Sequence, residues 1–252
     1  MILCDGKVFG FGANNDEQLA SSSCESSGDL PGAIVSLPTA IPIDSSGPIV
    51  QIDCGSSFSL AMDSNGKLFG WGSNEDGQLG LPEATESIKV PRVICENVSC
   101  FSAGSYHTAI VTKAGKVMTA GESGQSKLGR TGSGYEFGEI SLPTEIERPI
   151  NVACGGGVTF VACESGNIAV TGNGAKGELG LGTSVRDTED KFVLIPSVKF
   201  KSISAGANSN SAICAQSGVV YVWGDGSQRL LAKYSQNLYS PRPVKLPFQG
   251  IA

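Results

Sequence analysis

Short apolar runs alternate with glycine-rich polar turns along the whole chain. In HTAIVTKAGKVMTAG, which begins at His107, two β-branched or apolar runs flank a turn at 113–115, and this pattern predicts a β-hairpin. Equivalent turns stand at 64–66, 164–166 and 216–218. No segment sustains an apolar stripe at the helical period. The pattern therefore predicts an all-β protein.

Two sequence elements repeat. The first is seen best as GKLFGWGSNEDGQLGL from Gly66 and has five copies, and the second, such as VSCFSAGSYHTAIVTK from Val98, has four. The anchor glycines are Gly12, Gly72, Gly121, Gly172 and Gly224 in the first element, and Gly55, Gly104, Gly155 and Gly206 in the second. A spacing of about 50 residues indicates one supersecondary unit stacked repeatedly.

Each unit is expected to contain four short strands. Besides the hairpin, extended runs are predicted at proline-marked segments such as KVPRVI from Lys89 and SLPTEI from Ser141, and at the start of the second element. Four strands in about 50 residues is typical of a β-propeller blade. We treat 1–252 as one domain with a Ser-rich loop insertion at 20–47. Its units are approximately 1–64, 65–113, 114–164, 165–216 and an incomplete 217–252.

Composition restricts the function classes. The chain has 252 residues, of which 40% are hydrophobic, so it is long enough to bury a core. Its formal net charge is −6 without any Lys/Arg block, which argues against nucleic-acid binding. No apolar run is long enough to predict membrane insertion. The eight cysteines show no C-x-x-C spacing and His107 is the only histidine, so we expect no zinc site and a reducing compartment.

One stretch imitates a nucleotide-binding loop. In GNGAKGELGLG, the glycines of a G-x-G-x-x-G pattern and an adjacent lysine are Gly172, Gly174, Gly177 and Lys176. That pattern binds phosphate between a parallel strand and a helix, and no helix is predicted. The third glycine is replaced in other copies by Glu17, Ser126 and Arg229. We interpret the stretch as a propeller turn and expect no cofactor.

The remaining candidates for chemistry have structural interpretations. Trp71 and Trp223 occupy the aromatic position of the first element, where we expect packing between blades. His107 stands where other copies have Phe58, Val158 and Ser209, which predicts a semi-buried structural histidine. A lone histidine supplies no catalytic constellation, and RDTEDK from Arg186 lacks calcium-loop spacing. We therefore expect no catalytic residue and no metal.

The paired motifs resemble the regulator of chromosome condensation repeat. They are G-x-[LV]-[FY]-x-[WF]-G-x-N-x-x-G-Q-L-G, best at 66–80, and [CA]-G-x-x-H-[ST], best at 103–108. The resemblance implies the family's seven-bladed β-propeller. Within this family, the order of the repeat copies is most similar to the later blades of the retinitis pigmentosa GTPase regulator. The matching features are GKLFGWGSNEDGQLGL, then GES with KLG and VACGGG, then ELGLGT, and then YVWGDG.

About five units predict a partial or open ring. An open ring exposes strand edges and apolar faces between blades. Three explanations stay open: the chain is part of a longer protein, it closes with fewer blades, or it pairs with another chain.

The resemblance also implies function, because family members engage small GTPases or their carriers. The retinitis pigmentosa branch implies a ciliary or trafficking scaffold that binds a small GTPase with its lipid-carrier partner. We expect a non-enzymatic scaffold of this kind in the cytoplasm, with the cilium or nucleus as further sites. The alternatives are a guanine-nucleotide exchange factor for a small GTPase and the regulatory propeller of a larger kinase or ubiquitin ligase. Chromatin binding is disfavoured because no basic arm is present. The interaction residues are not identified by the sequence.

Overall fold

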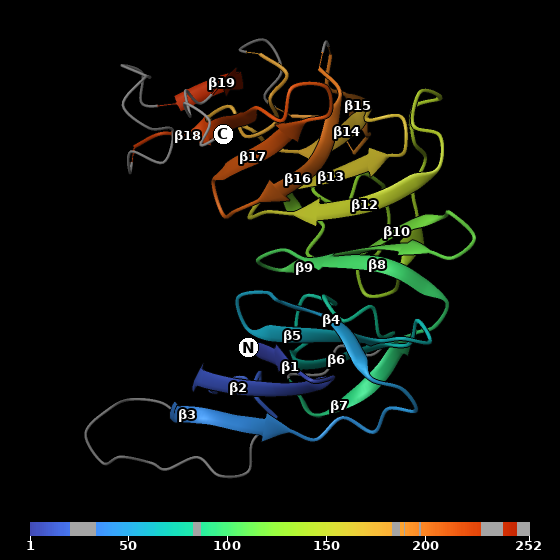
Figure 1. Ribbon diagram of the computed structural model, residues 1–252, viewed down its shortest axis with the longest axis vertical. Helices are drawn as coiled ribbons and strands as arrows, with labels where there is room; N and C mark the ends of the chain where they lie inside the picture. The colour runs from blue at the N-terminus through green and yellow to red at the C-terminus, as the bar shows by residue number, and fades with distance from the viewer. Residues whose placement is uncertain are drawn as a thin grey trace.

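Five antiparallel sheets stack in an arc that begins at the N-terminus (Figure 1). The computed structural model describes residues 1–20, 34–82, 87–182, 187–188, 190–196, 198–227 and 239–245. In these ranges the only helical element is a single 3-10 turn at Gly124–Ser126, and no helix has the length and apolar character that a membrane crossing needs. The fold is an open all-β propeller, as the sequence predicted.

The sheets, which we number I to V, are built from consecutive strands. Sheet I contains β1 (Ile2–Cys4), β2 (Lys7–Ala13) and β3 (Ile34–Ile41). Sheet II contains β4 (Ile49–Cys54), β5 (Phe58–Asp63), β6 (Leu68–Ser73) and β7 (Ser87–Cys95). Sheet III contains β8 (Val98–Ala103), β9 (His107–Thr112), β10 (Val117–Gly121) and β11 (Gly138–Glu139). Sheet IV contains β12 (Pro149–Cys154), β13 (Val158–Cys163), β14 (Ile168–Gly172) and β15 (Val193–Leu194). Sheet V contains β16 (Phe200–Ala205), β17 (Ser209–Cys214), β18 (Val220–Asp225) and β19 (Tyr239–Lys245).

The core lies between sheets. Strands β5, β6 and β13 are buried at every position, because a sheet in the middle of the stack is covered on both faces. Such strands read as continuous apolar runs rather than as alternating patterns. One apolar cluster joins sheets I to III, and two others fill the spaces between sheets III and IV and between sheets IV and V.

The sequence units and the sheets are offset. A sheet joins the second element of one unit to the first element of the next unit, so the unit 65–113 supplies strands to sheets II and III. The expected extended run at KVPRVI lies in β7, but the one at SLPTEI (141–146) is wrong. Ile146 is instead buried next to a turn in which its amide donates to the Pro143 carbonyl.

The predicted loop insertion at 20–47 needs a correction. Residues 34–41 form β3, which pairs antiparallel with β2. Val35 and Ile41 of this strand are buried against the core, which explains why the segment is extended. Part of the insertion, 21–33, lies outside the described residues.

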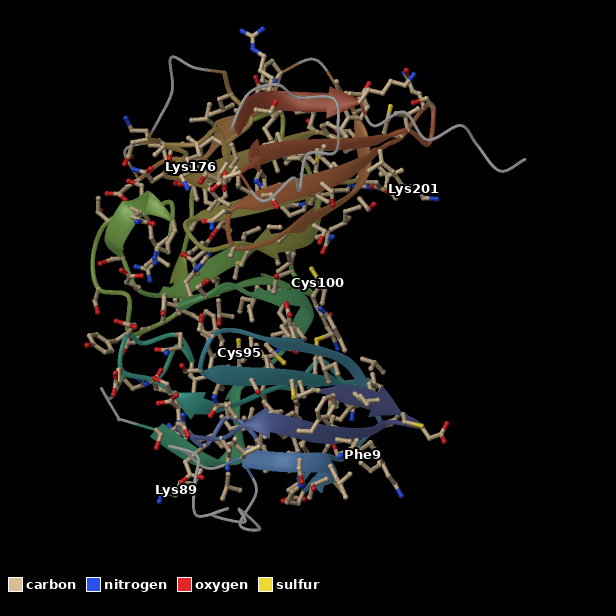
Figure 2. The ribbon with its side chains drawn as sticks, turned by 90° about the vertical axis from the view of Figure 1, so that its left-hand side faces the viewer. Phe9, Lys89, Cys95, Cys100, Lys176 and Lys201 are labelled. Carbon is tan, nitrogen blue, oxygen red and sulfur yellow. The ribbon has the colours of Figure 1, made fainter. Side chains whose placement is uncertain are left out.

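The two ends of the stack differ in structure. At one end, the turn after each inner strand bonds to the loop after the third strand; Glu122 N donates to Tyr106 O, and Asn173 N donates to Gly157 O. We call this end the loop face. The opposite end carries the hairpin turns and the connections between sheets, and we call it the hairpin face. In Figure 2 Lys176 marks the loop face and Lys201 lies on the opposite side.

Candidate functional site

A repeated hydrogen-bonded contact, which we call the inter-sheet latch, joins each sheet to the preceding one. The Trp71 indole N–H donates to the Gln18 carbonyl at 2.9 Å. Ser59, which is the cross-strand partner of Trp71, donates to the same oxygen at 2.7 Å. Trp223 repeats the contact on the Glu178 carbonyl at 2.9 Å. Both tryptophans are fully buried between sheets.

Threonines make the latch in sheets III and IV. Thr108 donates its hydroxyl to the Gln78 carbonyl at 2.6 Å, and Thr159 donates to the Lys127 carbonyl at 2.7 Å. Both threonines stand at the repeat position of Ser59, on the second strand of their sheets, where a hydroxyl donates in each case. The repeat position of Trp71, on the third strand, is Phe11 in sheet I, which has no sheet before it in the described part of the chain and is 46% exposed.

The motif glycines meet two different requirements. Those of the first element have φ between +94° and +127°: Gly12, Gly72, Gly121, Gly172 and Gly224. This left-handed region favours glycine. Those of the second element, Gly55, Gly104, Gly155 and Gly206, are not in that region. At Gly104 a Cβ would lie 2.7 Å from the Gly155 carbonyl oxygen of the next sheet, so a close backbone approach excludes other residues.

His107 is fully buried, not semi-buried as expected. Its Nε2 lies 2.7 Å from the Thr159 hydroxyl oxygen. Because that hydroxyl already donates to the Lys127 carbonyl, Nε2 must carry the proton and donate. Its Nδ1 has no partner. Burial, and then the positive charge of Lys127, lower the pKa of His107 to about 3. A neutral imidazole closed off from solvent packs the sheets and is not a catalytic base.

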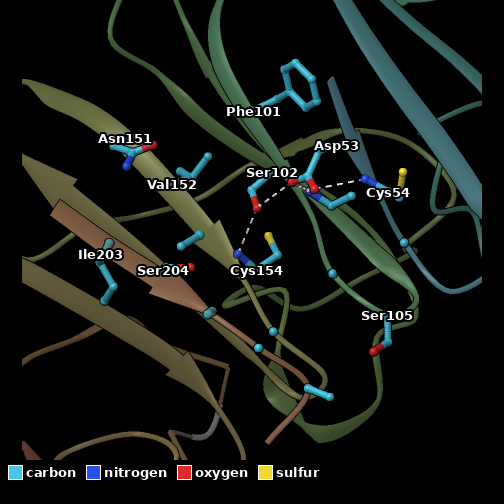
Figure 3. A pocket seen from close by; sticks show the side chains of 18 of the residues that line it. Asp53, Cys54, Phe101, Ser102, Ser105, Asn151, Val152, Cys154, Ile203 and Ser204 are labelled. Carbon is cyan, nitrogen blue, oxygen red and sulfur yellow. Dashed lines mark hydrogen bonds between the residues drawn. The ribbon is translucent and has the colours of Figure 1, made fainter. Parts of the chain in front are cut away.

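A cavity of about 480 Å³ lies against the inner strands of sheets II to V (Figure 3). Asp53 Oδ2 accepts from the Ser102 hydroxyl at 3.1 Å and from the Ala103 amide at 2.8 Å. Ser102 Oγ in turn accepts from the Cys154 amide at 3.1 Å. A polar side chain on one inner strand therefore satisfies an edge amide of the next strand.

The same cavity does not assemble catalytic chemistry. Burial, together with the Asp53 charge, raises the pKa of the Cys154 thiol to about 12. Although Cys54 is exposed overall, partial desolvation by the surrounding wall raises the pKa of its thiol too. A thiol needs a lowered pKa to act as a nucleophile, and no histidine lines the cavity. Within the described ranges no group of three or more metal-ligating side chains comes together either. The polar groups of this wall hold neighbouring sheets in register.

The stretch that imitates a nucleotide loop follows β14 of sheet IV and packs against sheet V. Lys176 Nζ lies 2.6 Å from Asp225 Oδ2 on the following sheet. This hydrogen bond lowers the pKa of Asp225 to about 2. At Gly174 a Cβ would lie 2.6 Å from the Leu179 side chain, so the turn requires the glycine for space. The lysine that would contact a phosphate is already paired.

Comparison with known proteins identifies the repeats. The family model of the Regulator of chromosome condensation (RCC1) repeat matches residues 5–62 and 65–111, and a second model of this repeat matches 49–78. The chain belongs to the RCC1 repeat family. Its narrower resemblance to the retinitis pigmentosa GTPase regulator stays a prediction.

The human probable E3 ubiquitin-protein ligase HERC6 is 29% identical over 261 residues, which cover 97% of this chain and 24% of HERC6. The chain thus spans about a quarter of that relative.

Solved RCC1-type structures share the fold. Human WBSCR16 aligns with a TM-score of 0.82 and 22% identity over 97% of this chain and 68% of its own. Prp20p from Saccharomyces cerevisiae, described with its binding to Gsp1p and histones, aligns with a TM-score of 0.78 and 20% identity over 97% of this chain and 60% of its own. Identities this low show the fold alone.

Proposed function

We propose that this chain is a non-enzymatic protein-interaction scaffold that binds a small GTPase or a lipid-binding carrier of one. The observation that carries the proposal is the loop face, where loops from successive sheets are presented side by side on a stack fixed by the inter-sheet latch. Binding residues are concentrated on loops that a rigid scaffold positions. Tyr106 and Tyr135 on this face are 43% and 38% exposed, and exposed tyrosines commonly anchor protein interfaces.

Two features of the relatives support the proposal and its second candidate. Prp20p, which has the same fold, is described with its binding to Gsp1p and histones. HERC6 aligns with 97% of this chain, which favours, as the second candidate, a regulatory propeller within a larger ubiquitin ligase. An exchange factor for a small GTPase is the third, because a binding scaffold becomes one if it distorts the nucleotide site. Fold alone decides between none of these.

A pull-down with purified small GTPases, each loaded with GDP or a GTP analogue, and with lipid-binding carriers tests the proposal. At least one should be enriched in proportion to added chain, and enrichment of none would refute it. A fluorescent-nucleotide release assay then separates scaffold from exchange factor. A scaffold leaves the release rate unchanged at catalytic amounts, whereas an exchange factor accelerates it. Imaging of the tagged chain tests the proposed location in the cytoplasm and at the cilium or nucleus.

A further inference from the structure

We infer that the loop face, rather than the hairpin face, is the binding face, and that it takes a protein partner with a basic contact surface. This inference rests on the proposed function in one respect only, namely that a protein is bound. It adds the surface and the charge of the partner.

Acidic side chains outnumber basic ones in the described loops of the loop face. The acids are Asp16, Glu17, Glu75, Asp76, Glu122, Glu136, Glu178, Asp187 and Asp190 in the loops, with Asp225 at the end of β18. Of these, Glu17 pairs with Lys89 of β7 at 3.7 Å. The bases are Lys127, Arg130, Lys176 and Lys191. The turns that complete this face, at 55–57, 104–106, 155–157 and 206–208, carry no charged residue. The surplus negative charge therefore belongs to the loops after the third strands.

Three of these four bases are already engaged. Lys127 is 2% exposed and pairs with Glu122. Lys176 pairs with Asp225 at 2.6 Å. Arg130 directs its guanidinium at oxygens of its own sheet and loop, including the Thr119 and Glu136 carbonyls, each at 2.9 Å. Glu75 and Glu136 remain exposed without an ion pair in the described structure.

On the hairpin face basic side chains stand among the acidic ones, and several of them form ion pairs across neighbouring turns. Lys116 pairs with Glu139 at 2.6 Å and Arg148 pairs with Glu164 at 3.3 Å. Lys67 pairs with Glu96 at 3.9 Å. Opposite charges that cancel locally leave little field at a distance, whereas a surface with one sign of charge steers an oppositely charged partner toward it. The difference in net charge between the two faces therefore favours binding of a basic partner at the loop face.

A hollow within the acidic surface supplies an anchor point. It has a volume of about 430 Å³ and is lined by Pro82, Arg130, Ser133, Tyr135, Glu136, Phe137 and Gly138. The Tyr135 hydroxyl donates to the Glu75 carbonyl at 3.1 Å, so the ring bridges the loops of sheets II and III and is held in place. A fixed, partly exposed ring beside the Glu136 carboxylate suits a Lys or Arg side chain of a partner, through cation–π attraction and charge pairing.

The test uses the ¹⁵N-labelled chain and, as probe, a soluble Lys/Arg-rich peptide, with its lysine-acetylated, arginine-free counterpart as the uncharged control. Amide signals of Glu75, Asp76 and Tyr135 should shift with saturation, and those of Lys116 and Glu164 should not. The triple variant Glu75→Gln, Asp76→Asn, Glu136→Gln should weaken binding about tenfold.

A matched variant makes the same charge change on the hairpin face, at Asp44→Asn, Glu145→Gln and Glu147→Gln, all of which are exposed. It should bind the peptide as the unaltered chain does. The inference is overturned if the hairpin-face signals shift, if both faces shift equally, if neither shifts, or if the two variants weaken binding equally.

These outcomes separate the inference from the proposed function. If the peptide maps to the loop face but no GTPase or carrier is enriched, the proposed function fails and the inference stands. If a GTPase is enriched but its binding is unaffected by the loop-face variant, the inference fails and the proposed function stands.

Discussion

The indole N–H of Trp71 donates to the backbone carbonyl of Gln18, 53 residues earlier, at 2.9 Å. This bond ties the third strand of sheet II to a loop of sheet I. The same bond joins Trp223 to Glu178 between sheets IV and V. A propeller blade has no stability alone because its apolar faces must be covered, so contacts between neighbouring repeats carry the fold.

Trp71→Ala should lower the free energy of unfolding by about 3 to 5 kcal/mol, because it leaves a large cavity between sheets I and II. Phe11→Ala is the matched control, since Phe11 stands at the same repeat position but is 46% exposed. It should cost less than about 1 kcal/mol. Urea unfolding followed by tryptophan fluorescence and circular dichroism measures both. Equal losses would contradict the role of the latch.

His107→Phe should flatten the dependence of stability on pH. The pKa of folded His107 is about 3, below its ordinary 6.5, so the unfolded chain binds more protons between these values. The stabilisation is complete above pH 6.5 and is lost as the pH falls toward 3, by at most about 1.4 kcal/mol per pH unit.

Phenylalanine occupies the equivalent position as Phe58, so the variant should fold. Urea midpoints between pH 7 and pH 5 should fall more steeply for the unaltered chain than for the variant. Identical slopes would show that His107 is accessible to protons in the folded chain.

Ser102→Ala should cost about 1 to 2 kcal/mol, because the Cys154 amide loses its acceptor and Asp53 loses a donor. Ser204 stands at the same repeat position in sheet V, and its side chain has no hydrogen-bond partner in the described part of the chain. Ser204→Ala should therefore be within about 0.5 kcal/mol of the unaltered chain. Thermal unfolding of the two variants compares them, and a larger cost at Ser204 would refute the coupling of inner strands.

Nucleotides should not bind to the glycine-rich turn at 172–182. Lys176 is held by Asp225 on the next sheet, and the turn lies between strands rather than before a helix. Titration of fluorescent ATP, GTP and NAD analogues should give no saturable signal. Saturable binding that Lys176→Ala abolishes would restore the nucleotide-loop interpretation.

Much of the fold follows from the sequence because glycine and apolar positions recur with the unit. The hairpin around Lys113 to Gly115 and the left-handed glycines such as Gly72 are local features, and local chemistry determines them. SLPTAI in β3 repeats the proline-marked pattern of SLPTEI. The same sequence pattern therefore predicts an extended conformation for both segments. Ile41 and Ile146 are both buried, so the two segments differ in backbone pairing, which 34–41 makes with β2.

The contacts between sheets could not be predicted. Thr159 and Lys127 belong to different sheets, and the hydroxyl-to-carbonyl bond that fixes the His107 tautomer exists only once sheets III and IV stack. The charge difference between the two faces likewise depends on which end of a strand each loop follows. Glu75 and Asp76 lie within the first repeat element, but the sequence does not show which end of the stack they share with Glu136.

The most direct test of the scaffold account is the equilibrium binding of purified small GTPases and lipid-binding carriers to the chain, measured by calorimetry alongside the loop-face and hairpin-face triple variants. The account predicts saturable binding of at least one of these proteins, weakened about tenfold by the loop-face variant and unchanged by the hairpin-face variant. Absence of binding across the panel would contradict it.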